Sequence, residues 1–209
     1  EFCQPKAEKP NEGFLIPNVE LPPLCSPKFR PGPPSDLAQI TTRFIADIVE
    51  NSRCIDLNDL CIAKERLAWC LYADLICLDH DGSLIDACLL ALMTALKTVR
   101  LPSVEYDPAI DNKLVNEDET KLLKVYSTPV SVTYAVFEDN LITDPTHEEE
   151  DLSSGLITIV VKDDNLCSVH KPGGNPISEE KLYECIQETI KHAELLRTLI
   201  DTAATGEND

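Results

Sequence analysis

The sequence predicts a single α/β (α+β) domain in which helices and strands pack in two layers. The first observation is its order, in which apolar strand-like segments and helical segments alternate before two strand pairs and a final helix. The second is size, because 209 residues with 43% hydrophobic side chains suffice for one substantial core. We therefore expect residues 1–209 to form one domain.

A proline-rich connector and a helix are expected first. Residues 14–34 contain seven prolines, which disfavour both helix and central strand, so we predict an extended connector. A proline-rich ligand for a partner is the alternative, but interleaved apolar residues such as Leu15 and Phe29 favour an ordered crossover. Ser35 is the expected N-cap of a helix that runs to about Asn51, with apolar residues at helical spacing.

The segment from Leu71 to Leu101 reads as one unit. An apolar run that ends at Leu78 predicts a strand buried on both faces. Asp81 and Gly82 predict a tight hairpin-like turn into a short second strand. Residues 84–96 are apolar on nearly all sides, which predicts a central helix covered by its neighbours.

The second half of the chain predicts a loop, two hairpins and a helix. Residues 107–121 are acidic and are expected to form a loop. Residues 130–137 should pair with 141–143, and residues 156–161 with 166–170, because turn-forming residues separate each pair. A last amphipathic helix is expected over about residues 178–201, followed by a loose tail at 203–209.

Charge and cysteine usage exclude several classes of function. The net charge is −19, and no basic cluster is present, so autonomous nucleic-acid binding is disfavoured. Nine cysteines without a CxxC pair indicate reduced thiols rather than disulfides. The histidines lack the spacing of a zinc site, so we expect no metal or other cofactor. No apolar run is long enough to predict a membrane-spanning helix.

Four segments carry a resemblance to a known family: IPNVELPPLCSPKFRPGPP (Ile16–Pro34), LYADLICLDHDGSLIDACLLALMTALKTVRL (Leu71–Leu101), STPVSVTYAVF (Ser127–Phe137) and DPTHEEED (Asp144–Asp151). With them, the chain closely resembles the RNase PH-type ring subunits of the eukaryotic RNA exosome. The resemblance implies the RNase PH fold. Family members normally carry further strands before the point at which this chain starts, so we expect an incomplete sheet with an exposed edge.

The resemblance also implies where catalytic groups would lie. Active relatives have a Gly-Ser-Arg phosphate cradle before the central helix, and those positions fall on Asp79, His80 and Asp81 here. Carboxylates there would repel phosphate. The general acid of active relatives matches Thr128, which is a poor proton donor near neutral pH. Gly82-Ser83 could be a surviving phosphate loop, but a turn is favoured.

RNA-gripping residues are also expected to be absent. A non-catalytic partner in archaeal rings supplies arginines from the first helix, where this chain has Asp47 and Glu50. Lys28 and Arg30, in the proline-rich connector, are the remaining candidates for RNA contact. The sequence therefore predicts a subunit without catalytic residues.

These observations predict a catalytically inactive structural subunit that forms part of an RNA-conducting ring. The resemblance implies paralogous RNase PH-like ring subunits, OB-fold and KH cap subunits and an associated hydrolytic ribonuclease as partners, with RNA bound only indirectly. It implies the nucleus, nucleolus and cytoplasm as locations, and no membrane. One alternative is an active phosphate-dependent 3′-to-5′ exoribonuclease. Another is a stand-alone acidic binding module, which would be a monodisperse monomer.

Overall fold

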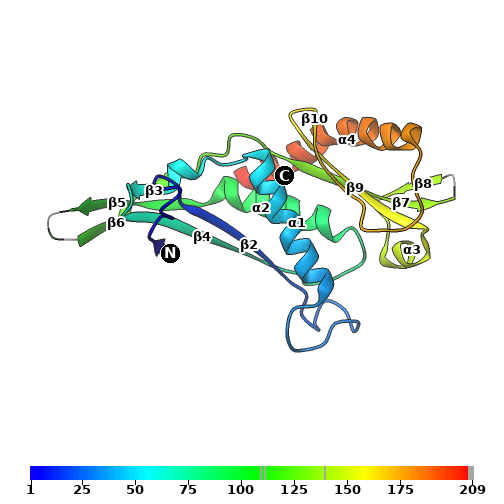
Figure 1. The fold of residues 1–209 in the computed structure, drawn as a ribbon, viewed down its shortest axis with the longest axis horizontal. Helices are drawn as coiled ribbons and strands as arrows, with labels where there is room; N and C mark the ends of the chain where they lie inside the picture. The colour runs from blue at the N-terminus through cyan, green and yellow to red at the C-terminus, as the bar shows by residue number, and fades with distance from the viewer. Residues whose placement is uncertain (109, 111, 139, 207–209) are drawn as a thin grey trace.

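A computed structural model describes residues 1–108, 110, 112–138 and 140–206 of the chain (Figure 1). The first sheet has the order β1-β4-β2, and β3 pairs with the same central strand β4. β2 runs parallel to β4, whereas β1 and β3 are antiparallel to it. Its strands are β1 (Phe2–Cys3), β2 (Phe14–Glu20), β3 (Cys61–Ala63) and β4 (Leu67–Ile76).

The second sheet is antiparallel and has the order β10-β9-β7-β8. The two predicted hairpins are confirmed, since β7 pairs with β8 and β9 pairs with β10. Asp163 and Asp164 both have positive φ in the connection between β9 and β10, as a tight primed hairpin turn requires. The strands are β7 (Val130–Phe137), β8 (Asn140–Thr143), β9 (Gly155–Lys162) and β10 (Asn165–His170).

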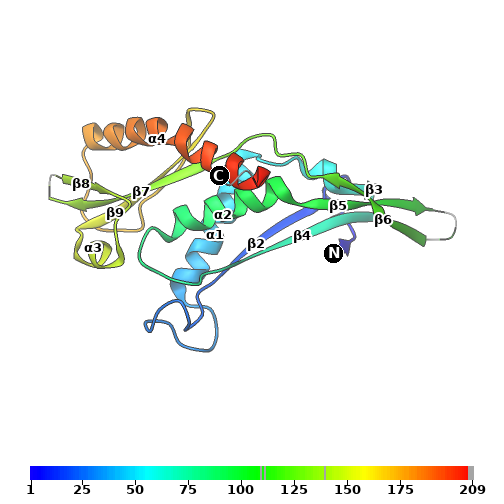
Figure 2. The same cartoon turned by 180° about the vertical axis from the view of Figure 1, so that it is seen from behind.

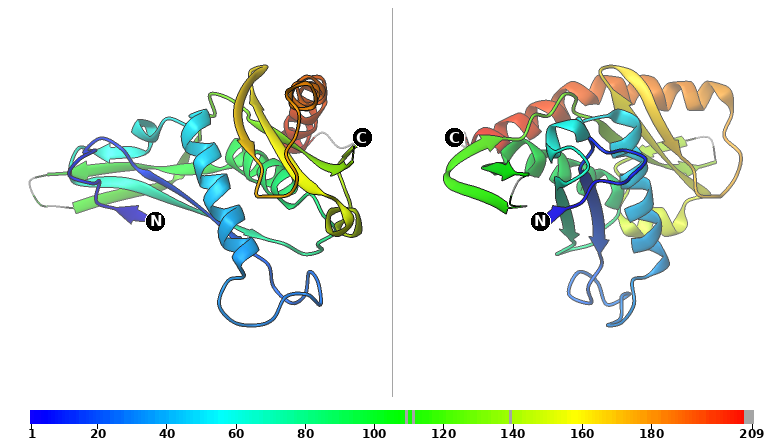
Figure 3. Two further views of the ribbon diagram at one scale, coloured as in Figure 1. Left: turned by 45° about the vertical axis from the view of Figure 1, so that its right-hand side comes forward. Right: turned by 60° about the vertical axis from the view of Figure 1, so that its left-hand side comes forward.

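Two helices lie between the sheets. α1 (Asp36–Ser52) packs against β2 and β10, and α2 (Leu84–Thr98) packs against β4 and β7 (Figure 3). α4 (Glu179–Thr205) covers the other face of the second sheet and also contacts α2. The mixed α/β class is confirmed, with the helices between two sheets rather than in a simple two-layer stack. The fully buried core includes Ile45, Ile48, Leu89, Met93 and Ile159.

The helix predictions hold closely. Ser35 caps α1, and its side chain accepts a hydrogen bond from the Ala38 backbone N–H at 3.3 Å. α2 begins at Leu84 as predicted and extends two residues further than the apolar run. α4 begins one residue after Ser178 but continues to Thr205, so the expected loose tail is wrong for residues 203–205. Residues 207–209 lie outside the described residues.

Only the second part of the predicted proline-rich connector, residues 21–34, is a connector in the structure. Residues 14–20 form β2, contrary to the prediction of extended coil over 14–34. β2 lies at the end of the strand order β1-β4-β2, so Pro17 occurs in an edge strand, where a missing N–H is tolerated. Val19 is buried beneath α1. Residues 21–34 contain no helix or strand, as expected of a connector.

The predicted acidic loop is instead a hairpin. β5 (Arg100–Asp107) pairs with β6 (Asn112–Leu122) in a separate two-stranded sheet. Charged residues hide this strand in the sequence because it is exposed along its whole length and lacks a buried apolar face. The loop prediction is therefore wrong for residue 107 and for residues 112–121, and residues 109 and 111 lie outside the described residues.

Two details around β4 also differ from prediction. Residues 77–83 contain no strand, and the chain passes directly into α2. The predicted second strand is therefore wrong, and Gly82 ends a loop rather than a hairpin. β4 is not buried on both faces, because Tyr72 and Ile76 are each 57% exposed on one side. The helices between the sheets cover only its other face.

Candidate functional site

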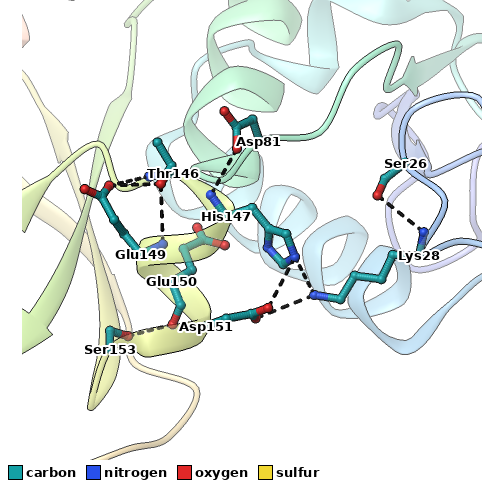
Figure 4. Close-up of polar contacts among 9 residues, drawn as sticks. All are labelled: Ser26, Lys28, Asp81, Thr146, His147, Glu149, Glu150, Asp151 and Ser153. Atoms are coloured by element: carbon teal, nitrogen blue, oxygen red, sulfur yellow. Dashed lines mark hydrogen bonds and ion pairs between the residues drawn. The ribbon is translucent and has the colours of Figure 1, made fainter.

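Three segments meet beside the N-terminus of α2: the loop 77–83, the connector 21–34 and α3 (His147–Leu152) (Figure 4). Backbone hydrogen bonds hold the loop 77–83 against the end of β2 and against the connector. Cys77 donates its N–H to the Glu20 carbonyl and His80 donates to the Cys25 carbonyl, each at 3.0 Å. The loop that carries Asp79, His80 and Asp81 therefore lies against the connector that carries Lys28.

α3 is a short helix with a capping box. The Thr146 hydroxyl accepts from the Glu149 N–H, and the Glu149 carboxylate accepts from the Thr146 N–H at 2.8 Å. The acidic run after Asp144, Pro145 and Thr146 indicates a helix start in the sequence, and the Thr-x-x-Glu spacing is the matching capping signal.

Gly82 allows α3 to pack directly on the loop. A Cβ at this position would lie 2.2 Å from the Pro145 carbonyl oxygen and 2.9 Å from the His147 nitrogen. Its φ of +88° also favours glycine. The glycine therefore serves a close backbone contact with α3, which leaves no space for a bound anion at that point.

Two carboxylates of the protein itself accept hydrogen bonds from backbone N–H groups at the starts of α2 and α3. Glu150 Oε1 accepts a hydrogen bond from the Ser83 N–H at 2.9 Å, at the N-terminus of α2. Helix N-termini bind anions because their N–H groups are unpaired and point outward. Asp81 Oδ1 accepts from the His147 N–H at 3.3 Å, at the start of α3. Sequence reasoning missed Glu150 because its partner is 67 positions away.

Lys28 is held by α3. Its Nζ lies 2.7 Å from His147 Nε2 and 3.6 Å from Asp151 Oδ1. The His80 ring meets the Phe29 ring at 5.5 Å and the His147 ring at 5.4 Å between centroids, both edge to face. Lys28, one of the two candidate RNA-contact residues, is therefore already paired with a carboxylate and an imidazole of its own chain.

Arg30 lies further along the same connector. It lines a hollow of about 520 Å³ between the connector, β2 and the start of α1. Phe29, Lys28 and several prolines share this lining. Arg30 is therefore the candidate cation that is exposed and accessible to a ligand in this hollow.

α2 is fastened to β7 by a partly buried carboxylate. Asp86, in the first turn of α2, accepts hydrogen bonds from the Ser131 hydroxyl at 2.5 Å and the Thr133 N–H at 2.7 Å. Burial raises the pKa of Asp86 to about 6, against the lowering effect of these hydrogen bonds. This partly buried carboxylate is held between α2 and β7 and serves the fold.

Thr128 lies apart from this cluster. Its carbonyl accepts a hydrogen bond from Arg197 at 3.4 Å, and neighbouring Ser127 donates to the Ser52 carbonyl. Ser52 ends α1, whereas the connector precedes its start. A helix of this length spans about 25 Å. The structure therefore brings Asp79, His80 and Asp81 together with Lys28, and places Thr128 at the far end of α1.

The remaining predicted positions lie on α1. Asp47 pairs with Arg43 at 3.1 Å one turn earlier, and Glu50 is exposed. Within the described ranges, no three His, Cys, Asp or Glu side chains are grouped as a metal site. None of the described helices is long and apolar enough to cross a membrane.

Comparisons with known proteins identify the family to which this fold belongs. Residues 2–102 match the model of the 3′ exoribonuclease family, domain 1, and residues 127–191 match domain 2 of the same family. The chain belongs to the RNase PH-type 3′ exoribonuclease family. The hairpin of β5 and β6 lies largely between the two matched segments of this family member.

Relatives in this family are named as exosome components. The chain is 42% identical to "Exosome complex component rrp43" of Schizosaccharomyces pombe over 90% of its length and 70% of that protein. It is 30% identical to "Exosome complex component Rrp42" of Methanothermobacter thermautotrophicus over 98% of its length and 75% of that protein. A solved Archaeoglobus fulgidus exosome with RNA bound to the active site contains a similar chain. It has TM-score 0.82 and 32% identity, covering 95% of this chain and 75% of that one.

Proposed function

We propose that this chain is a catalytically inactive structural subunit of an RNA exosome ring. The contact between Glu150 and the N-terminus of α2 carries the proposal. Phosphorolysis needs a phosphate dianion positioned in line with the scissile bond. To reach this helix end, phosphate would have to displace Glu150, separate α3 from Gly82 and approach Asp81. Each step is opposed by charge repulsion or by lost packing.

The ring role rests on the family and on its exosome relatives. The chain would bind neighbouring RNase PH-like subunits and contribute a wall of an RNA-conducting channel. OB-fold and KH cap subunits and a hydrolytic ribonuclease would supply RNA capture and cleavage. The net charge of −19 supports RNA capture by other subunits, because phosphate contacts dominate RNA affinity and an acidic chain makes few of them. Arg30, and Lys28 if released from α3, would be the local RNA contacts.

Within the family, the proposed type is the ring subunit commonly called exosome component eight. The residues of Ile16–Pro34 and Asp144–Asp151 support it, and the 42% identity to fission-yeast Rrp43 supports an Rrp43-type assignment. Such a subunit would act in RNA processing and decay in the nucleus, nucleolus and cytoplasm. Tagging the endogenous protein and imaging its location would test the last point.

An assay of phosphorolysis tests the proposal. The purified chain, alone and with ring partners, is incubated with poly(A) and inorganic phosphate, and nucleoside diphosphate release is measured. We expect no release above a no-enzyme control, and no gain for Glu150→Gln, because the cradle also lacks its arginine. Phosphate-dependent release by the chain alone would establish the alternative, an active exoribonuclease. Release only with a partner would be assigned by inactivating that partner.

A further inference from the structure

The hairpin of β5 and β6 projects from one end of the molecule, away from the helices (Figures 1 and 2). Its base is closed by a hydrogen bond from the Leu123 N–H to the Val99 carbonyl at 3.0 Å. On one side, Lys113 Nζ lies 4.0 Å above the Phe2 ring, which itself packs on Trp69. The hairpin is thus closed at its base beside α2 and contacts β1 through Lys113, which pairs with Tyr106 near the turn.

β6 is exposed along its entire length. All 11 residues of this strand are exposed, including Leu114 at 65% and Val115 at 41%. In the part of the chain that the structure describes, β6 pairs only with β5. A two-stranded ribbon is marginally stable in water, and an open edge offers backbone groups to another strand. A third strand would therefore stabilise this ribbon.

The open edge carries a concentrated negative charge. Pro102 pairs with Thr120, but the next residue, Ser103, pairs with Asn116. The skipped residues Glu117, Asp118 and Glu119 consequently bulge out of the ladder, and the Asp118 N–H is satisfied by Asn116 Oδ1 at 3.2 Å. Over residues 100–122 the sequence has six acids and three bases. Charge complementarity therefore favours a cationic partner strand.

This feature lies outside the matched family segments. Domain 1 of the family ends at residue 102 and domain 2 begins at residue 127. All of β6 falls between them. The two family models therefore do not by themselves assign a role to its exposed apolar residues and its acidic bulge.

We propose that β6 is a docking edge for an extended segment of another protein, one that alternates Lys or Arg with apolar residues. The segment adds to β6 as a third strand, so backbone hydrogen bonds provide affinity and side chains provide specificity. Its apolar residues share one face of the added strand and pack against Leu114, the more exposed of the two apolar residues, and its cations meet the bulge at 117–119. The inference goes beyond the proposed ring function, because the same edge would serve a stand-alone protein.

The test uses the full chain and a short synthetic peptide that alternates lysine with valine. Binding is measured by calorimetry, and the bound site is located by backbone hydrogen exchange. We expect binding that slows exchange of the amides in 112–122 and leaves α4 unchanged. A peptide with the same lysines, in which two central valines are replaced by proline, should not bind, because proline removes strand donors. If the exchange of 112–122 is unchanged, or if the proline peptide binds equally, the proposal fails.

Matched charge variants separate docking from general attraction to an acidic protein. Glu117→Lys, Asp118→Lys and Glu119→Lys together should weaken binding about tenfold or more, since close charges are lost. The control reverses three exposed acids of α4, Glu180→Lys, Glu184→Lys and Glu194→Lys, with the same change in net charge. It should change affinity by about twofold at most. Equal weakening by both triple variants would overturn the proposal. The phosphorolysis assay is independent of this outcome.

Discussion

The carboxylate of Asp86 accepts a hydrogen bond from the backbone N–H of Thr133 at 2.7 Å, and so ties the first turn of α2 to β7. Because burial raises the pKa of Asp86 to about 6, the folded state binds this proton more tightly than the unfolded state. The stabilising effect of the proton is complete below the ordinary pKa of an aspartate. It is lost as the pH rises through about 6.

Asp86→Asn should remove this pH dependence. The amide oxygen can still accept from Thr133, while the amide group donates to Ser131. The free energy of unfolding of the wild type, minus that of the variant, should rise by about 1 kcal/mol as pH falls from 7.5 to 5. Urea unfolding followed by circular dichroism at several pH values measures it. A difference that does not change with pH would show that the Asp86 pKa is not raised.

Gly82→Ala should destabilise the protein by about 2 kcal/mol or more, because its Cβ would overlap the Pro145 carbonyl at a positive φ. Gly173→Ala is the matched control, since nothing lies within 4 Å of that Cβ and its φ is not in the left-handed region. Thermal unfolding of both variants tests the difference. Equal melting temperatures would mean that α3 does not pack on Gly82.

Tyr134→Phe should cost about 1 to 2 kcal/mol of stability. Its buried hydroxyl bonds to Thr189 Oγ1 at 2.9 Å and to the Cys185 carbonyl at 3.1 Å, and thereby joins β7 to α4. Tyr183→Phe, at a side chain 63% exposed, should be nearly neutral. Chemical denaturation measures the free energy of unfolding of both variants. If Tyr134→Phe leaves it unchanged, these hydrogen bonds do not contribute to stability.

RNA affinity of the isolated chain should be weak, with a dissociation constant of about 10⁻⁴ M or higher at physiological salt, because an acidic protein releases few counterions. Arg30→Ala should weaken this residual RNA binding more than Lys28→Ala does, since Lys28 is paired with His147 and Asp151. Fluorescence anisotropy with single-stranded RNA over a salt series measures both. Micromolar binding by the isolated chain would contradict the expectation.

Coexpression with an RNase PH-like neighbour should raise both soluble yield and melting temperature. Tyr72, Ile76 and Leu78 expose apolar surface on one face of β4 and at its end, and a partner that binds only the folded state stabilises it. Size-exclusion chromatography and thermal unfolding of the chain with and without the neighbour measure this. A monomer that melts cooperatively and does not respond to partners would favour the stand-alone binding module.

Local signals in the sequence determined much of this fold. The Ser35 cap and the apolar spacing after it predict α1, and the polar turns after residues 137 and 161 predict the two hairpins. These elements depend on interactions between residues close in the chain, so the types of those residues are enough to predict them. The position of Asp79, His80 and Asp81 before α2 followed from the family resemblance, whereas the short second strand that the same segment predicted is wrong.

Only the tertiary structure decided the features that join distant segments. β2 exists because Phe14–Glu20 pairs with β4, more than 50 residues later, and β6 exists because it pairs with β5 despite its charged sequence. Glu150 reaches the N-terminus of α2 from α3, and Thr128 is separated from Asp81 by the length of α1. Such pairings depend on the path of the whole chain, which no local pattern of residues specifies.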